Sequence, residues 1–209
     1  MQVTIEKSPN AIATFQMEPG ETLLAAPGRL LSQSSGVTLR SVFGSGYQPK
    51  RRGLSAFLHS LVGFVAAFFQ KIVRGADSFW HMYRASTPSR LVLTPSLPGE
   101  ITALPLQGRS LYFHPESFLA CSAGIELVQA PRAPLLCATG VGTLYLCGFG
   151  EIASIEVEGN YALDFERFVA LEPSLSFQLQ QKTLELFGNG RLWIHTGKIS
   201  RMTSLRTSW

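Results

Sequence analysis

Residues 155–159 read Ile-Glu-Val-Glu-Gly, an alternation of apolar and charged side chains that ends at a glycine. This alternation is typical of a half-buried β-strand, and the glycine is typical of the turn that follows such a strand. The same arrangement occurs at residues 15–20 (Phe-Gln-Met-Glu-Pro-Gly) and at residues 104–108 (Leu-Pro-Leu-Gln-Gly). Three stretches of the chain therefore carry the same strand and turn signal.

The segments that follow these glycines also match one another. A leucine or valine comes ten or eleven residues after each glycine, and a second leucine or branched residue follows six residues later. Each copy then reaches an apolar strand, a glycine and a short second strand, at residues 90–101, 143–152 and 191–199. Two strands around a glycine turn are typical of a β-hairpin, so we interpret the three stretches as copies of one β unit.

This pattern predicts an all-β fold with a pseudo-threefold internal repeat. The chain has 209 residues, 45% hydrophobic and 15% charged, which is enough for a single β domain over residues 1–209. The expected units are residues 13–106, 107–157 and 158–205, and the first unit contains an insertion at 44–89. An ordinary β-sandwich with recurring glycine spacing is the alternative interpretation.

The insertion contains a segment whose apolar residues recur with helical spacing. From Leu54 to Val73, leucine, phenylalanine, valine and isoleucine fall on one arc, and small or weakly polar residues fall on the other. We therefore expect one amphipathic α-helix over about residues 53–73. A membrane crossing is disfavoured, because polar residues interrupt the apolar run and a crossing would split the repeated body between two compartments.

Three roles stay open for this helix: it covers its own β body, packs against copies of itself, or lies on a membrane surface. Packing within the protein or its oligomer is favoured, because a membrane-surface helix usually carries many basic residues on its polar face. The basic run before the helix keeps the membrane role open, since it would attract anionic lipid. The expected contact residues are Arg51, Arg52, Phe57, Leu61, Phe64, Phe68 and Phe69.

Aromatic residues beside cations suggest a second candidate site, in a cleft between the β units. The candidates are Trp80, Arg84, Arg191 and Trp193. Such residues can stack nucleic-acid bases or bind a small ligand. Core packing and cross-strand pairing explain the same residues without a ligand and are the favoured interpretation.

No combination of residues points to catalysis or to a metal. The four histidines are widely separated, the chain has two aspartates, and the three cysteines lie in apolar runs without Cys-x-x-Cys spacing. We therefore expect no enzymatic activity, no catalytic residues, no metal and no cofactor. The formal net charge of +4 is a small excess, so nucleic acid is a disfavoured partner.

The first residues of the chain bear on its location. Glu6 and Lys7 stand where a signal peptide would need an apolar stretch. We expect a cytoplasmic protein without a signal peptide, and association with a membrane through the helix stays open.

Several short motifs resemble the family named for altered inheritance of mitochondria, number 24. The resemblance runs from about residue 13 to residue 200, with a departure at residues 45–70, where the helix replaces the usual glycine-rich loop. The motifs are Pro19-Gly20-Glu21-Thr22, Ala26-Pro27-Gly28, the segment 93–101 (Leu-Thr-Pro-Ser-Leu-Pro-Gly-Glu-Ile), Ser117-Phe118-Leu119-Ala120, Leu163-Asp164, Phe168-Val169-Ala170 and Phe187-Gly188-Asn189-Gly190.

This resemblance implies a double-stranded β-helix, or jelly-roll-like, fold grouped with the tryptophan RNA-binding attenuator. It also implies trimeric assembly in some members, supplies no catalytic residues, and links the mitochondrial members to inner-membrane organisation. Grouping by fold does not transfer RNA binding.

The sequence thus predicts a non-enzymatic β scaffold that forms homo-oligomers, with a trimer as the favoured size, and that docks a membrane surface or a protein through its helix. A small-ligand or RNA-binding module with a cleft between the β units is the alternative.

Overall fold

The protein is an all-β molecule, as its repeated strand pattern predicted. The computed structural model describes residues 1–7, 10–130 except 44–78, and 133–197, and within these ranges regular structure consists of β-strands and two short 3-10 turns. The expected helix over about 53–73 lies outside the described residues. Among the described residues, no helix has the length and apolar character needed to cross a membrane.

The described residues form seventeen strands. Their bounds are β1 Gln2–Glu6, β2 Ile12–Met17, β3 Thr22–Ala25, β4 Leu30–Gln33, β5 Val37–Phe43, β6 Phe79–Ala85, β7 Ser89–Leu93, β8 Ile101–Pro105, β9 Leu111–Phe113, β10 Phe118–Ser122, β11 Ile125–Gln129, β12 Leu136–Gly140, β13 Thr143–Cys147, β14 Ile152–Asp164, β15 Phe168–Leu171, β16 Ser176–Gln180 and β17 Thr183–His195. The 3-10 turns η1 Pro115–Ser117 and η2 Phe165–Arg167 precede β10 and β15.

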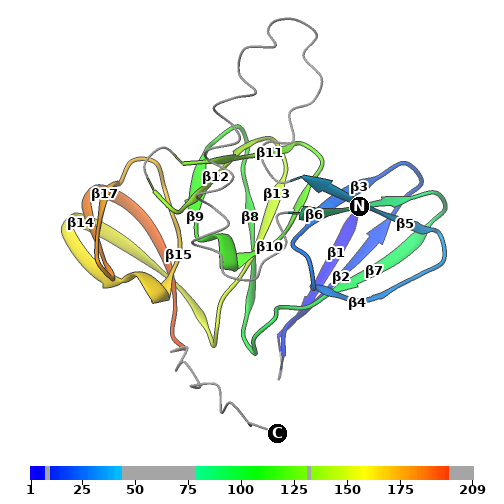
Figure 1. Ribbon diagram of the computed structural model, residues 1–209, viewed down its shortest axis with the longest axis horizontal. Helices are drawn as coiled ribbons and strands as arrows, with labels where there is room; N and C mark the ends of the chain where they lie inside the picture. The colour runs from blue at the N-terminus through cyan, green and yellow to red at the C-terminus, as the bar shows by residue number, and fades with distance from the viewer. Residues whose placement is uncertain (8–9, 44–78, 131–132, 198–209) are drawn as a thin grey trace, which may run out of the picture.

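These strands form three sheets, which follow one another along the long axis of the molecule (Figure 1). The first sheet has the order β1-β2-β7-β4, and the second has the order β5-β6-β3-β10-β13-β8. The third sheet has the order β11-β12-β9-β15-β17-β14, and β16 adds to β17.

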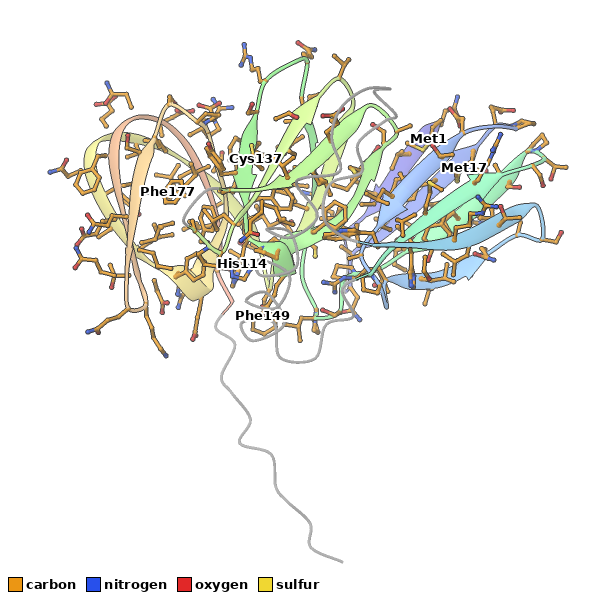
Figure 2. The ribbon with its side chains drawn as sticks, turned by 45° about the horizontal axis from the view of Figure 1, so that its top comes forward. Met1, Met17, His114, Cys137, Phe149 and Phe177 are labelled. Atoms are coloured by element: carbon orange, nitrogen blue, oxygen red, sulfur yellow. The ribbon has the colours of Figure 1, made fainter. Side chains whose placement is uncertain are left out.

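Two hydrophobic cores lie between adjacent sheets and a third lies within the third sheet, and Figure 2 shows the side chains of the described residues. Phe15 belongs to the core between the first and second sheets, where its ring meets Tyr145 edge-on at 5.0 Å. Phe118 belongs to the core between the second and third sheets. Phe168 belongs to the third core, inside the long β14–β17 hairpin. Each sheet between two cores thus buries both of its faces.

The strand pairing follows one pattern in three successive groups: β2 to β7, β8 to β13, and β14 to β17. The first strand pairs with the last, the second with the fifth, the third with the last, and the fourth with the fifth. In the third group, Gly159 divides β14 into two halves and the opposite Gly188 divides β17. The halves of β14 correspond to the first and second strands of the other groups, and the halves of β17 correspond to the fifth and sixth. A bulge interrupts the third strand at one place in every group, at residues 30–32, 118–120 and 168–170.

Adjacent groups are joined by a second kind of pairing. The second strand of one group lies beside the third strand of the next, as β3 lies beside β10 and β9 beside β15. The linkers between groups also lie side by side, because Gly99 bridges Gly150 and the N–H of Gly197 donates to the carbonyl oxygen of Phe149 at 2.8 Å.

The turn glycines that define the repeated pattern share one backbone conformation. Gly20, Gly108 and Gly159 have φ angles of 90°, 82° and 80°. A side chain at this φ strains the backbone, whereas glycine adopts it freely. The prediction that a glycine ends a strand and turns the chain is confirmed for Gly20 and Gly108, which lie between strands. It is wrong for Gly159, because β14 continues through this residue to Asp164 and Gly159 pairs with Gly188 of β17.

The inserted segment leaves the body at the end of one hairpin. Strands β5 and β6 pair along their whole length, and the last pair is Phe43 with Phe79. Strand β6 and the start of β7 lie within the expected insertion at 44–89, so the described strand pattern is interrupted at residues 44–78. The corresponding connections in the other groups are short, at residues 130–135 and 181–182.

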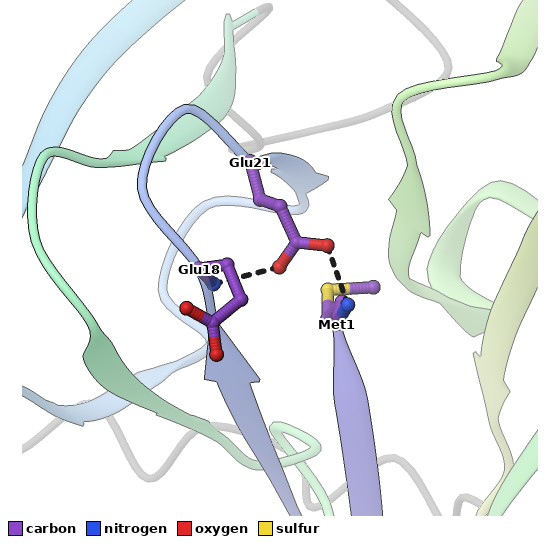
Figure 3. A network of polar contacts seen from close by, with 3 residues as sticks. All are labelled: Met1, Glu18 and Glu21. Carbon is purple, nitrogen blue, oxygen red and sulfur yellow. Dashed lines mark hydrogen bonds and ion pairs between the residues drawn. The ribbon is translucent and has the colours of Figure 1, made fainter.

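The amino terminus is held to the turn between β2 and β3 (Figure 3). The Met1 ammonium group contacts a carboxylate oxygen of Glu21, whose second oxygen accepts the N–H of Glu18 at 2.8 Å. The hydrogen bond from the ammonium group holds the pKa of Glu21 below its usual value.

A candidate interaction edge

One strand differs from its two counterparts in exposure. All four residues of β4 are exposed, whereas the four residues of β15 and the first four of β10 are buried. Leu31 of β4 is 55% exposed, although Leu119 and Val169 at the equivalent positions are completely buried. The sequence pattern aligned these three residues, but it did not indicate that one of them faces solvent.

The reason for this exposure is a missing neighbour. Strand β10 has a strand on each side, β3 and β13, and β15 likewise lies between β9 and β17. Strand β4 pairs with β7 on one side and ends the sheet on the other. Among the described residues, β4 therefore presents a free backbone edge.

The backbone groups on this edge follow from the pairing with β7. The N–H of Ser34 donates to the carbonyl oxygen of Arg90 at 2.9 Å, so Ser32 and Ser34 direct their backbone groups toward β7. Because these groups alternate along an antiparallel strand, the N–H and C=O of Gln33 face the open side. We expect the Leu31 carbonyl on the same side, because the carbonyl oxygen of the equivalent Leu119, at the same bulge, accepts the N–H of Ala26 from β3.

A hollow of about 460 Å³ lies beside this edge, on the face of the first sheet that points away from the first core. Val92 on β7 lines it, and the equivalent residue of the next group is Tyr145, which is buried against Phe15 of the preceding group. In the first group no earlier group covers this face. The lining residues are Glu6, Ile12, Thr14, Leu31, Ser32, Gln33, Ser34, Arg90 and Val92.

Arg29 anchors the start of β4. The residue is 8% exposed, and its guanidinium donates to the carbonyl oxygen of Glu116 at 3.1 Å. The backbone carbonyl oxygen of Arg29 accepts the N–H of Thr94. Both contacts hold the chain just before β4 against neighbouring elements. They fix the position of the chain at the residue before β4 begins.

The four residues of the expected ligand cleft lie in two separate sheets. Trp80 and Arg84 are on β6, and Trp193 and Arg191 are on β17. Both tryptophans pack against the second core, and Trp80 meets the ring of Phe118 at 4.6 Å.

The two arginines of this set have different surroundings. Arg191 forms an exposed ion pair with Glu156 at 2.5 Å and lies 5.9 Å from the Trp193 ring. Arg84 is exposed on the other sheet. None of the four expected cleft residues lines the hollow beside β4, and their binding of a ligand stays a prediction. The expected helix contacts, from Arg51 to Phe69, lie outside the described residues.

The three cysteines of the chain are buried. Cys121, Cys137 and Cys147 are free thiols, and burial raises the pKa of Cys121 to about 12. Burial likewise lowers the pKa of His114 and of His195. Within the described ranges, no group of three or more His, Cys, Asp or Glu is placed to hold a metal ion.

A known protein family matches this chain in sequence. The model of the family described as mitochondrial biogenesis AIM24 matches residues 3–204, nearly the whole chain. The chain belongs to the AIM24 family. The family resemblance of the short motifs is thereby confirmed.

Two streptococcal proteins are similar to this AIM24-family chain. An uncharacterised protein of Streptococcus pyogenes serotype M6 is 24% identical over 212 residues, covering 94% of this chain and 81% of the relative. A crystal structure of a Streptococcus pyogenes protein matches with a TM-score of 0.70 and 21% identity, over 94% of each chain. At that identity the structural match shows a shared fold.

Proposed function

We propose that this AIM24-family chain is a non-enzymatic β scaffold that assembles with copies of itself. The observation that carries the proposal is the exposed edge of β4, whose counterparts β10 and β15 are buried between two strands. The size we propose is a trimer, the assembly that the family resemblance implies. The buried thiols, with their raised pKa, support a role other than nucleophilic chemistry.

The edge itself has the properties of an interface. An open strand edge invites pairing with another chain, and monomeric proteins commonly protect it with lysine, proline or a covering loop. Strand β4 carries Leu30 and Leu31, which are 40% and 55% exposed. Two exposed leucines beside unpaired backbone groups favour association over solvation.

We also propose that the β body arose from three copies of one structural unit. Each of the three strand groups is then a repeat of the double-stranded β-helix type, within one domain over residues 1–209. The recurrence of the pairing, including the bulge at the same place in each group, supports this interpretation.

We further propose that residues 51–74 dock the scaffold to a membrane surface or a protein partner. The paired ends of β5 and β6 support this role, because a segment that leaves from a hairpin end can present side chains without interrupting the sheet. Contact residues would include Phe64 and Phe68.

Native mass spectrometry of the full chain tests the assembly. We expect a species of three times the 22.9 kDa chain mass at micromolar concentration. A monomer at all concentrations would contradict the proposal.

Co-sedimentation with anionic and neutral liposomes tests the docking segment. The comparison uses the full chain and a variant in which residues 51–74 are replaced by a short Gly-Ser linker. Sedimentation of the full chain alone supports membrane docking. If neither chain sediments and both stay folded, the membrane role is contradicted and docking to protein partners remains.

A further inference from the structure

We propose that residues 160–164 of one copy pair with β4 of a second copy, as an antiparallel continuation of the same sheet. The inference rests on the proposed self-assembly and names the two surfaces that meet. It makes the contact between copies equivalent to the contact between consecutive strand groups within one chain.

The first observation is that the chain already makes this contact twice. Ala25 lies opposite Ala120, and the N–H of Ala26 donates to the carbonyl oxygen of Leu119 at 3.0 Å. In the next pair of groups, Phe113 lies opposite Ala170, and the N–H of His114 donates to the carbonyl oxygen of Val169 at 2.9 Å.

The second observation is that the matching edge is also free. Residues 160–164 occupy the place of β3 and β9 in the third group and pair with β17 on one side. Strand β14 ends its sheet on the other side. Ala162 and Asp164 are exposed, and Tyr161 is 37% exposed. The described part of the chain therefore has one third strand, β4, and one second strand, residues 160–164, that each have a neighbour on one side only.

The backbone of this edge is oriented for pairing. The N–H of Phe165 donates to the carbonyl oxygen of Lys182 at 2.7 Å, so the odd-numbered residues of this segment face β17. The N–H and C=O of Ala162 and the N–H of Asp164 consequently face the open side.

The register follows from the two internal contacts. Leu163 takes the place of Ala25 and Phe113, and Ser32 takes the place of Ala120 and Ala170. Leu163 of one copy then lies opposite Ser32 of the next, and Ala162 lies opposite Gln33. The N–H of Asp164 donates to the Leu31 carbonyl oxygen, which repeats the bond from Ala26 to Leu119.

This contact would complete a sheet. Strands β16, β17 and the second half of β14 would join β4, β7 and β2, in the same order as the six strands of the second sheet. Leu31 would enter the third core of the neighbouring copy, as Leu119 enters the first core and Val169 the second core within one chain. The hollow beside β4 would be covered by the same contact.

The contact joins different copies because the two edges are far apart in one molecule. Figure 1 shows β4 and β14 at opposite ends of the long axis. Two different surfaces that meet head to tail close into a ring or extend as a filament. A ring of three copies would satisfy the free edge of every copy.

The variant Ala162→Pro tests the edge without touching the internal hairpin. Proline removes an N–H that faces the open side, and edge strands tolerate proline at such positions. We expect Ala162→Pro to abolish the oligomer while its far-UV spectrum stays that of a β protein. The control Ala162→Thr keeps the N–H and should assemble like the parent chain.

Mixed cysteine cross-linking tests the register. A chain with Gln33→Cys and a differently tagged chain with Ala162→Cys are mixed under mild oxidation. Opposed residues of an antiparallel pair lie about 4.5–5.5 Å apart at their Cα atoms, within the range of a disulfide. We expect a covalent dimer that carries both tags, and little cross-linking when Asn160→Cys replaces Ala162→Cys.

The outcomes separate this inference from the proposed function. An oligomer that survives Ala162→Pro, or that cross-links Gln33→Cys only to itself, would overturn the head-to-tail pairing while leaving self-assembly in place. A parent chain that is monomeric would overturn both.

Discussion

At the scale of single residues, two positions favour glycine for different physical reasons, one for lack of space and one for its backbone conformation. Gly99 approaches the neighbouring linker so closely that a Cβ atom would collide with the carbonyl oxygen of Gly148 and lie 2.8 Å from the nitrogen of Gly150. Gly159 has open space around it, but its φ of 80° disfavours a side chain. We expect Gly99→Ala to lower the free energy of unfolding by about 3 kcal/mol, and Gly159→Ala by about 1 kcal/mol. Urea denaturation measures both, and equal losses would contradict the close approach of the linkers.

Glu100 gives the stability of the fold a dependence on pH. Its carboxylate accepts the N–H of Ile152 at 2.9 Å and faces the Lys7 ammonium at 3.4 Å. The bond from Ile152 lowers the pKa of Glu100 below its ordinary value of 4.5. Its contribution is therefore complete above pH 4.5 and is lost as the pH falls through the lowered pKa.

The variant Glu100→Gln should thus be less stable than the parent at pH 7, by about 1 kcal/mol. The difference should shrink as the pH falls below 4.5, because the parent carboxyl becomes protonated as the pH passes through its lowered pKa. Urea denaturation between pH 3 and 7 measures this. A difference that stays constant over the range would contradict the assigned bond.

The residue pattern predicted where glycines are needed, but it did not predict the solvent exposure of Leu31. The positive φ of Gly20, Gly108 and Gly159 follows from local chemistry, which a sequence displays directly. The exposure of Leu31 depends on which strand lies beside it, and a strand partner is a long-range property. Leu31, Leu119 and Val169 look alike in sequence, so the sequence does not distinguish the exposed position from the two buried ones.

At the scale of elements, the inserted segment should be separable from the sheet that carries it. Replacement of residues 51–74 by a Gly-Ser linker leaves all pairs between β5 and β6 in place. We expect the variant to keep the unfolding midpoint of the parent within a few degrees. If the segment is the amphipathic helix that its sequence predicts, the variant also loses circular dichroism at 222 nm. An unchanged signal would contradict the helix.

The all-β class and the turns at Gly20 and Gly108 could be predicted from alternation and glycine spacing, whereas Gly159 lies inside β14. The pairing between groups could not, because it joins strands that are distant in the chain, such as β3 and β10. The candidate cleft residues were chosen for their chemistry, and two of them, Trp80 and Trp193, turn out to pack against a core. Aromatic character alone does not separate a packed ring from a ligand contact.

At the scale of the whole molecule, the described residues present a strand edge at each end of the row of sheets, and we propose that these two edges are complementary. The first sheet offers β4, and the third sheet offers residues 160–164. Each internal sheet buries apolar residues on both faces, so the cores continue from one group to the next. Assembly of copies would extend the same arrangement across the boundary between chains.

Hydrogen exchange of single amides in the unmodified full chain tests this account most directly. The account predicts that the amides of Gln33, Ala162 and Asp164 are protected as strongly as those of Ala26 and His114, which bond across groups within the chain. Protection should fall when the protein is diluted below the concentration at which it assembles. Fast exchange at these three positions in the assembled protein, with Ala26 and His114 protected, would contradict it.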